Sequence, residues 1–280
     1  MRDSDEEAKF FLDKTKPNHA NLHIITVSVP GQVAALNAGL DSVKGDIIAF
    51  TDDDAIPHPD WLKKIEERFS ADPKTGGVGG KDDLYINGRL EHGSRKVVGK
   101  MQWCGRLAGN HHLGFGNARE VDTLKGSNMS FRRDAIINLK FDLRLRGEGA
   151  QVRNDTALCF SVKKAGWKLI YDPAIQIDHY LAERHEENQR GNFNWRAVED
   201  GAYNETLVFM EYLSPLRRIG YVIFFMLMGN IFTPGFLEFI RILPREKGNA
   251  FLRLCAAYKG RFEGVKTWIG GSDLVASRRR

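Results

Sequence analysis

The chain has 280 residues, of which 42% are hydrophobic and 28% are charged. This balance excludes a disordered chain and fits one or two globular domains with a hydrophobic core. Three cysteines are widely spaced without a metal-ligand pattern, and the charged segment Met1–Glu7 is unlike a signal peptide, so we expect a reducing compartment.

The formal net charge of +5 is unevenly distributed along the chain. From Arg217 to the end there are 12 Lys/Arg and 4 Asp/Glu, a net charge of +8. Residues 1–216 therefore carry the remaining 29 Lys/Arg and 32 Asp/Glu, a net charge of −3. A basic C-terminal quarter is typical of proteins that contact nucleic acid or an anionic membrane surface, and it also serves solubility alone.

The N-terminal part of the chain predicts a helix, a strand and a second helix. Ser4 and Glu7 have the spacing of a capping box, which predicts a short helix that ends before Pro17. The segment Leu22–Val29 is rich in β-branched residues and predicts a strand. The segment Gly31–Val43 has apolar residues on one face at helical spacing and predicts a helix.

The most informative stretch of the chain comes next. The short apolar strand Ile47–Phe50 is followed by three aspartates, Asp52, Asp53 and Asp54. Adjacent carboxylates repel one another where they are partly desolvated, and a bound cation relieves this repulsion. Because ligands of α/β sheets bind beyond the carboxyl ends of the strands, the position favours a divalent metal site. A solvated acidic turn is the alternative, since aspartate favours turns and prolines follow closely.

A helix, a glycine-rich strand and a long irregular region follow. We expect a helix at Trp61–Phe69 and a loop with a strand at Gly76–Leu84. The region Gly88–Gly126 is polar and without periodicity, and its length indicates a functional surface. It contains His111 and His112, but neighbours in sequence rarely both face one ion. Packing or substrate contact is therefore favoured over a metal site for this pair.

The next elements complete the predicted sheet. A helix begins at Asn154-Asp155 and ends at Gly166. The sequence then predicts a strand at Lys168–Tyr171, a turn at Asp172-Pro173 and another strand at Ile175–His179. The alternation of strands and helices predicts an α/β layered sheet, and the continuously apolar strand Ile47–Phe50 is typical of a parallel sheet that is covered on both faces.

Several short motifs follow one another along this part of the chain. They are Gln32–Gly39, Asp52–Asp54, Gly126–Arg133, Asn154-Asp155 before a Leu-rich helix, and Tyr171–Pro173 with His179. Their order and spacing resemble the family 2 nucleotide-sugar glycosyltransferases of GT-A type. The resemblance implies a GT-A-like, Rossmann-related fold with a mostly parallel sheet and helices on both faces. It covers roughly residues 1–180, so we expect this domain at residues 1–182 and a helical, basic, membrane-associated region at residues 183–280.

The resemblance implies a metal-dependent transfer of a sugar from a nucleotide-diphosphate sugar to a hydroxyl of a glycan or lipid-linked acceptor. Asp52 and Asp54 match the family's Asp-x-Asp position, where Mg²⁺ or Mn²⁺ bridges the two phosphates of the donor. His179 matches a position that some members use as a metal ligand or phosphate contact, and a satisfied strand-end histidine is the alternative. Asp155 matches the base of a single, inverting displacement, with a helix cap as the alternative.

Other residues match the family's nucleotide-sugar site. Together with Asp52 they are Gln32, Asn37, Asp53, Gly126 and Asn128. Gln32 and Asn37 could equally be polar positions on a helix face. Gly126 and Asn128 resemble the loop that receives the donor sugar and acceptor, and glycine permits close approach of the backbone.

Two features depart from the family pattern. Asn154 stands where the family usually has glutamate, and Met1 falls about where the family's second strand ends. From the position of Met1 we expect the family's first strand, helix and strand to be missing, as in a truncated product or a late start codon. Two alternatives stay open: a catalytically inactive relative that acts as a membrane interaction module, and a nucleotidyltransferase.

An apolar segment lies in the basic C-terminal quarter. The segment Ile219–Leu237 contains 19 uncharged residues, close to the ~20 that span a bilayer, and Pro234-Gly235 interrupts it. Because basic residues flank it, we expect a helical hairpin in or on the anionic, cytoplasmic face of the cell membrane. A buried pair of core helices is the alternative. Nucleic acid is disfavoured, because the basic residues flank an apolar run and do not line a polar groove.

Overall fold

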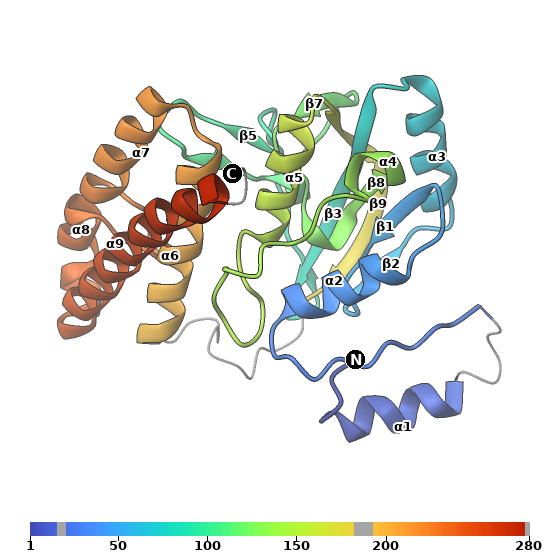
Figure 1. Cartoon of the computed structure of the whole chain (residues 1–280), viewed down its shortest axis with the longest axis horizontal. Helices are drawn as coiled ribbons and strands as arrows, with labels where there is room; N and C mark the ends of the chain where they lie inside the picture. Colours follow the sequence, from blue (N-terminus) through green and yellow to red (C-terminus); the bar gives the residue numbers. More distant parts are fainter. Residues whose placement is uncertain (16–20, 182–192, 278–280) are drawn as a thin grey trace.

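The computed structural model describes residues 1–15, 21–181 and 193–277. It contains a central β-sheet with helices on both faces and, beside it, the group of helices α6–α9 (Figure 1). The sheet with helices on both faces confirms the predicted α/β class. The predicted boundary between residues 182 and 183 lies outside the described residues.

The central sheet is mixed, so the prediction of a mostly parallel sheet is wrong. Its strands lie in the order β1 (Ile47–Phe50), β8 (Met129–Arg132), β3 (Thr75–Ile86), β9 (Lys168–Tyr180) and β2 (Ala55–Pro57). Among the paired strands of the described chain, only β3 and β9 are parallel. Strands β1, β3 and β9 do run in one direction, but β8 inserts between β1 and β3, antiparallel to both.

Short elements organise the long region between β3 and β8. Strand β4 (Arg89–Leu90) pairs with β3, and β7 (Arg119–Val121) pairs with β9. Strands β5 (Lys100–Met101) and β6 (Leu107–Ala108) form a separate hairpin. Two 3₁₀ helices, η2 (His111–Leu113) and η3 (Gly126–Asn128), lie in the same region.

The segment Leu22–Val29 is not the strand that its β-branched residues predict. Within the described chain it makes one isolated bridge, between Val27 and Arg2, and no ladder. β-branched residues form a strand only where a neighbouring strand offers a ladder and a surface to pack on. The first helix, α1 (Glu6–Thr15), is capped by the Asp5 carboxylate, one residue later than predicted.

Helices cover both faces of the sheet and divide the core into two clusters. They are α2 (Gln32–Ser42), α3 (Trp61–Ala71), α4 (Arg133–Ile136) and α5 (Asn154–Lys164). Helix α3 packs on one face against Val78 and Ile177, and α2, α4 and α5 pack on the other. Ile47 and Ile48 are neighbours on β1 but contact different clusters, as expected of a strand buried on both sides.

Strand β9 is continuous where the sequence predicts two strands and a turn. Its register with β3 shifts after Gly80, so residues 173–175 bulge out of the ladder. A Cβ on Gly80 would lie 1.8 Å from the Ile175 carbonyl oxygen, so this close approach requires glycine. Because the number of extra residues is odd, the bulge reverses the faces to which later side chains point. It therefore sets the direction of His179 at the end of the strand.

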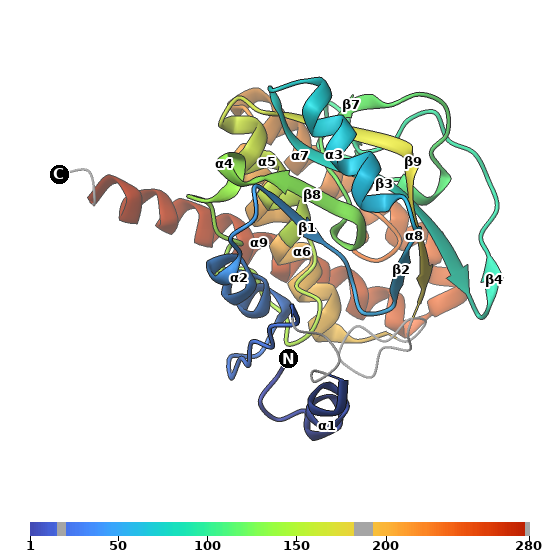
Figure 2. The same ribbon diagram turned by 90° about the vertical axis from the view of Figure 1, so that its right-hand side faces the viewer.

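The C-terminal helices pack directly against the sheet domain. They are α6 (Trp195–Tyr212), α7 (Pro215–Leu227), α8 (Phe236–Glu246) and α9 (Gly248–Ser277). Helix α9 packs along α6, and its last turns extend past the rest of the molecule (Figure 2). Leu207 and Phe209 of α6 belong to the same buried cluster as Phe131 and Leu158 of the sheet domain. The hydrophobic core is therefore continuous across the predicted boundary.

Helices α7 and α8 form the helical hairpin that the sequence predicts. The side-chain oxygen of Asn230 holds the turn between them by accepting hydrogen bonds from the N–H groups of Phe232 and Thr233, both at 2.9 Å. Tyr221 and Phe225 are buried, but the outer side of the hairpin is apolar and exposed. In the described part of the chain, no helix combines the length and hydropathy needed to cross a membrane.

Candidate active site

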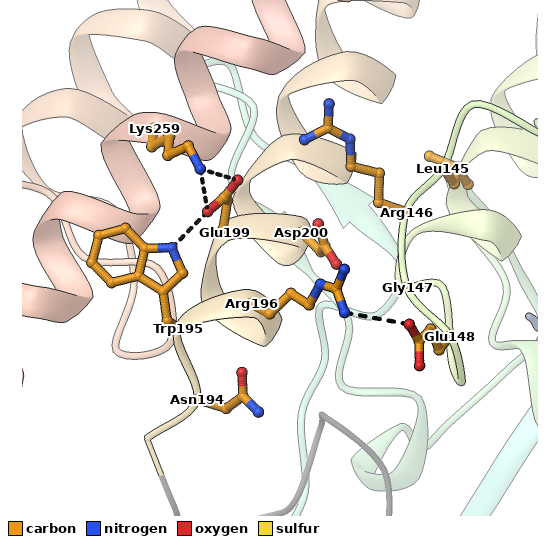
Figure 3. Close-up of a pocket in the computed structure, with 10 residues that line it drawn as sticks. All are labelled: Leu145, Arg146, Gly147, Glu148, Asn194, Trp195, Arg196, Glu199, Asp200 and Lys259. Atoms are coloured by element: carbon orange, nitrogen blue, oxygen red, sulfur yellow. Dashed lines mark hydrogen bonds and ion pairs between the residues drawn. The ribbon is translucent and has the colours of Figure 1, made fainter.

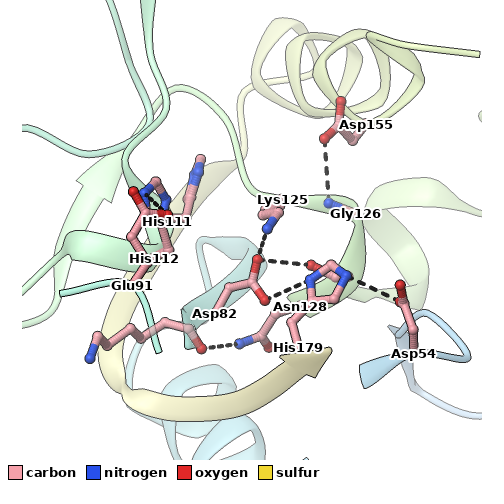
Figure 4. A network of polar contacts seen from close by, with 12 residues as sticks. Asp54, Asp82, Glu91, His111, His112, Lys125, Gly126, Asn128, Asp155 and His179 are labelled. Atoms are coloured by element: carbon pink, nitrogen blue, oxygen red, sulfur yellow. Dashed lines mark hydrogen bonds and ion pairs between the residues drawn. The ribbon is translucent and has the colours of Figure 1, made fainter. Parts of the chain in front are cut away.

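The three aspartates lie beside His179 because β2 pairs with the end of β9. Ala55 is the register partner of His179, and the N–H of Tyr180 donates a hydrogen bond of 2.8 Å to the Asp54 carbonyl. One ligand atom from each of Asp52, Asp54 and His179 lies within 4.8 Å of the others. Figure 4 shows the imidazole of His179 between Asp54 and a second carboxylate.

This group has the charge and the donor atoms that a divalent cation requires. Burial and the neighbouring Asp54 carboxylate raise the pKa of Asp52, against the opposing effects of His179 and Lys125. A protein site that concentrates carboxylates in this way is relieved by a cation. Carboxylate oxygens suit Mg²⁺ and Mn²⁺, and an added imidazole also suits the transition metal. The residues therefore fit a divalent metal ion.

Asp155 lies in the first turn of α5. Arg153 precedes the helix in a left-handed conformation with φ 75°, and Asn154 donates hydrogen bonds to Gln151 and to Gln32. Arg153 is the N-cap and its side chain makes no capping bond, so neither Asn154 nor Asp155 is the cap. The Asp155 carboxylate accepts a hydrogen bond of 3.3 Å from the backbone N–H of Gly126 (Figure 4).

A single pocket of about 720 Å³ brings these groups together. Its walls contain six of the residues predicted from the sequence: Gln32, Asp52, Asp54, Gly126, Asp155 and His179. The basic side chains of Arg106, Lys125 and Arg153 also line it. The pocket therefore combines a cluster of metal-ligating groups, basic side chains and a separate carboxylate at a helix start.

Three other predicted residues do not line this pocket. Asp53 is exposed beside the cluster. The amide of Asn37 makes two hydrogen bonds to the backbone of Phe141, at 2.9 and 3.0 Å. The buried amide of Asn128 accepts from the indole of Trp61 and donates to two backbone carbonyls. Both asparagines thus act as supports of the surrounding chain.

Four residues near the site were missed in the sequence. Lys125 directly precedes the Gly126–Arg133 motif, and Arg153 directly precedes Asn154-Asp155. Their places next to these motifs could have marked both as residues of the site. Asp82 on β3 and Glu205 on α6 lie far from every motif, and no local pattern distinguishes them. Their contacts with the site depend on the folded chain.

The two neighbouring histidines face different partners. His111 is buried, and its Nε2 lies 3.0 Å from the Thr123 carbonyl oxygen. Burial lowers the pKa of its imidazole. His112 lies 3.5 Å from the carboxylate of Glu91. The two histidines are therefore engaged in packing and side-chain contacts. This agrees with the sequence analysis, which favoured packing or substrate contact over a shared metal ion.

A second hollow, of about 820 Å³, lies between α6 and the segment before α5 (Figure 3). None of the predicted site residues lines it. Two ion pairs lie in its lining: Glu199 pairs with Lys259, and Arg196 pairs with Glu148. The metal-ligating group found among the described residues lies in the first pocket and not in this hollow.

The family model described as glycosyltransferase like family 2 matches residues 2–196. The chain belongs to this family. The match covers the whole sheet and ends at the start of α6, so it includes both the aspartate cluster and Asp155.

The curated relatives that the chain matches are distant in sequence. A glucosyl-dolichyl phosphate glucuronosyltransferase of Haloferax volcanii is 26% identical over 162 residues, which cover 56% of this chain and 48% of that protein. A poly-β-1,6-N-acetyl-D-glucosamine synthase of Staphylococcus aureus is 25% identical over 172 residues, which cover 61% of this chain and 39% of that protein. The matched region thus spans less than half the length of either relative.

A solved glycosyltransferase structure shares the fold. The crystal structure of GalNAc-T7 with UDP, GalNAc and Mn²⁺ has a TM-score of 0.54 and 15% identity, and the match covers 73% of this chain and 39% of that one. At this identity the likeness shows the GT-A-like fold alone.

Proposed function

We propose that the protein transfers a sugar from a nucleotide-diphosphate sugar to a hydroxyl of a glycan or lipid-linked acceptor. The observation that carries this proposal is the pocket itself, which joins the Asp52, Asp54 and His179 cluster to Asp155. Family membership supports it. The solved GalNAc-T7 structure, which holds UDP and Mn²⁺ on a similar fold, supports the choice of ligands.

In this proposal Asp52, Asp54 and His179 hold Mg²⁺ or Mn²⁺. A bound cation there would neutralise the negative charge that develops on the departing nucleoside diphosphate. Arg106 lines the same pocket and adds positive charge near the proposed phosphate site, and Lys125, which also lines it, forms an ion pair with Asp82. Gln32 and Gly126 line it as well and are the proposed contacts to the donor.

Asp155 is the proposed base. Its carboxylate accepts the proton of the acceptor hydroxyl while the oxygen attacks the anomeric carbon and the bond to the diphosphate breaks. A single displacement of this kind inverts the anomeric configuration. The Gly126 N–H at 3.3 Å holds the carboxylate at the pocket wall, and the start of α5 favours its negative charge.

We further propose that the α7–α8 hairpin lies on the anionic, cytoplasmic face of a membrane. The outer side of the hairpin exposes a set of apolar side chains: Leu216, Ile219, Val222, Ile223, Leu227, Met228, Ile231, Phe236, Leu237, Ile240 and Leu243. Residues 215–253 contain six Lys/Arg and two Asp/Glu, a charge that complements anionic lipid.

The hairpin also contributes to the pocket. Gly229, Asn230, Phe232 and Thr233, in the turn between α7 and α8, line the same hollow as Asp155. An acceptor anchored in the membrane would therefore reach the base along the hairpin. This arrangement favours a lipid-linked acceptor over a soluble one.

The function can be tested with the full chain and a panel of nucleotide sugars. We expect Mn²⁺- or Mg²⁺-dependent release of a nucleoside diphosphate from at least one donor. Release of pyrophosphate would instead favour a nucleotidyltransferase. If the folded chain binds metal but turns over no donor, with or without added lipid-linked acceptors, an inactive interaction module is favoured.

A further inference from the structure

A buried carboxylate lies behind His179, on the side away from Asp54. The side chain of Asp82 on β3 is fully buried. Its Oδ1 lies 2.9 Å from His179 Nδ1, while His179 Nε2 lies 3.1 Å from Asp54 Oδ1 (Figure 4). The imidazole is therefore held between one buried carboxylate and one carboxylate of the metal-ligating cluster.

We propose that Asp82 is a positioning residue that fixes the tautomer and the ring direction of His179, so that Nε2 is presented to a metal ion beside Asp54. The proposal rests on the function proposed above, since it concerns the same cluster. Asp82 itself is not a ligand of the proposed ion, because His179 lies between it and Asp54.

The register of the sheet explains why these two residues meet. Asp82 is the register partner of Ile177 on β9, so the two side chains share a face of the sheet. His179 follows Ile177 by two residues and points to the same face, because side chains alternate along a strand. The bulge at residues 173–175 determines the face of the sheet to which these side chains of β9 point. Without the bulge, His179 would point to the other face.

The proton positions follow from the chemistry of the two groups. An ionised carboxylate only accepts hydrogen bonds, so the 2.9 Å contact with Asp82 requires a proton on Nδ1 of His179. The 3.1 Å contact of Nε2 with Asp54 requires a proton on Nε2 only while no cation is bound, and a cation in its place would meet the Nε2 lone pair, which is the form that binds a metal. Metal-ligating histidines commonly donate their other N–H to a carboxylate, which fixes the tautomer and raises the basicity of the ligand.

The remaining contacts of Asp82 keep it charged and in place. Lys125 forms an ion pair with its Oδ2, and the Ser127 hydroxyl donates to the same oxygen at 3.4 Å. A buried carboxylate without such partners would be costly, so the lysine and the histidine together stabilise the ionised form. Lys125 and Ser127 line the pocket. Through its contacts with these two residues, Asp82 on β3 connects the pocket wall to the central sheet.

The neighbouring Asp83 offers a matched control. It is also buried and acidic, but its carboxylate pairs with Lys81 at 2.6 Å and accepts from Gln176 at 3.2 Å. As the next residue on β3 it points to the opposite face, away from His179. Asp82→Asn and Asp83→Asn therefore remove the same charge from the same strand, and only the first changes the partner of His179.

The first test is Mn²⁺ binding to the full chain, followed by the electron paramagnetic resonance of the free ion. We expect Asp82→Asn to weaken Mn²⁺ binding by roughly 10- to 100-fold, the usual effect of removing a carboxylate behind a ligating histidine. Asp83→Asn should bind as the unsubstituted chain does. Equal affinities for the chain with and without Asp82→Asn would overturn the proposal.

The second test uses the unsubstituted, metal-free chain and requires no variant to fold. Isotope-labelled histidine NMR reports which ring nitrogens of His179 carry a proton. We expect a proton on Nδ1, and an Nδ1 without a proton would overturn the proposal. If the chain binds no Mn²⁺ at all, the proposed function fails, and the NMR result still decides the role of Asp82.

Discussion

The guanidinium of Arg153 forms an ion pair with the carboxylate of Glu205, directly before the helix start that carries Asp155. Glu205 is buried on α6, and Arg153 also lies over the ring of Phe209 at 5.9 Å. Since Arg153 adopts a left-handed conformation, this pair holds a strained turn in position. Helix α6 therefore supports the wall of the pocket that contains Asp155.

Breaking this pair should destabilise the protein. Glu205→Gln leaves Arg153 without its buried partner, and we expect a loss of about 3 kcal/mol, the low end for breaking a buried ion pair. Urea unfolding of Glu205→Gln, Arg153→Gln and the double variant measures the coupling. The exposed pair Arg196–Glu148 is the control, where Glu148→Gln should cost less than about 1 kcal/mol. If the loss in free energy of unfolding of the double variant equals the sum of the losses of the two single variants, a direct interaction between Arg153 and Glu205 is contradicted.

Removing the proposed base should affect turnover and leave donor binding intact. Asp155→Asn keeps the size of the side chain and its ability to accept from Gly126, but it cannot take a proton. We expect the transfer rate to fall roughly 100- to 10,000-fold. Calorimetry with the nucleotide sugar and metal should give an unchanged Kd. A variant that keeps normal transfer would exclude Asp155 as the base.

The aspartate cluster should make the metal-free protein less stable as the pH rises. The pKa of Asp52 is raised above its ordinary value of 3.8 by burial and by Asp54. The folded protein thus binds this proton more tightly than the unfolded chain, so the contribution to stability is complete below pH 3.8 and is lost as pH rises through the raised pKa. Asp52→Asn cannot ionise and should melt higher than the unsubstituted chain at neutral pH without metal. An equal or lower Tm would count against charge repulsion in this cluster.

Charge on the outer side of the hairpin should release the protein from membranes. Ile219 and Ile223 are 60% and 55% exposed, so Ile219→Glu with Ile223→Glu should leave the fold intact. Sedimentation with phosphatidylglycerol vesicles should show roughly tenfold weaker binding or more, because apolar area is lost and anionic charge is added. Phe10→Glu with Phe11→Glu, at exposed positions of α1, is the control and should bind normally. Equal binding of both variants would place the membrane contact elsewhere.

The parts of the site that the sequence predicted carry their signal locally. An apolar strand that ends in Asp52–Asp54 and a helix that starts at Asn154-Asp155 are each visible within a few residues. The hairpin is similar, because an uncharged segment with Pro234-Gly235 near its end predicts both the helices and the turn. In each case the chemistry and the local structure depend on the same short stretch of chain.

The parts that the sequence could not predict depend on distant contacts. The direction of β8, the bulge in β9 and the partners of Asp82 and Glu205 arise only when strands pair and helices pack. Asn37 and Asn128 illustrate a second limit, because an amide that binds a nucleotide and an amide that binds the backbone look alike in a sequence. The segment Leu22–Val29 illustrates a third, because strand propensity does not provide a partner strand.

The central claim is that Asp52, Asp54 and His179 hold the divalent ion of a nucleotide-sugar site. The most direct measurement is a Mn²⁺ titration of the full chain and of Asp54→Asn, with and without UDP or GDP, followed by electron paramagnetic resonance. We predict one saturable site that binds Mn²⁺ more tightly with the nucleotide present and that weakens more than roughly 100-fold in Asp54→Asn. Mn²⁺ binding that is unchanged by Asp54→Asn, or no binding with either nucleotide, would contradict the account.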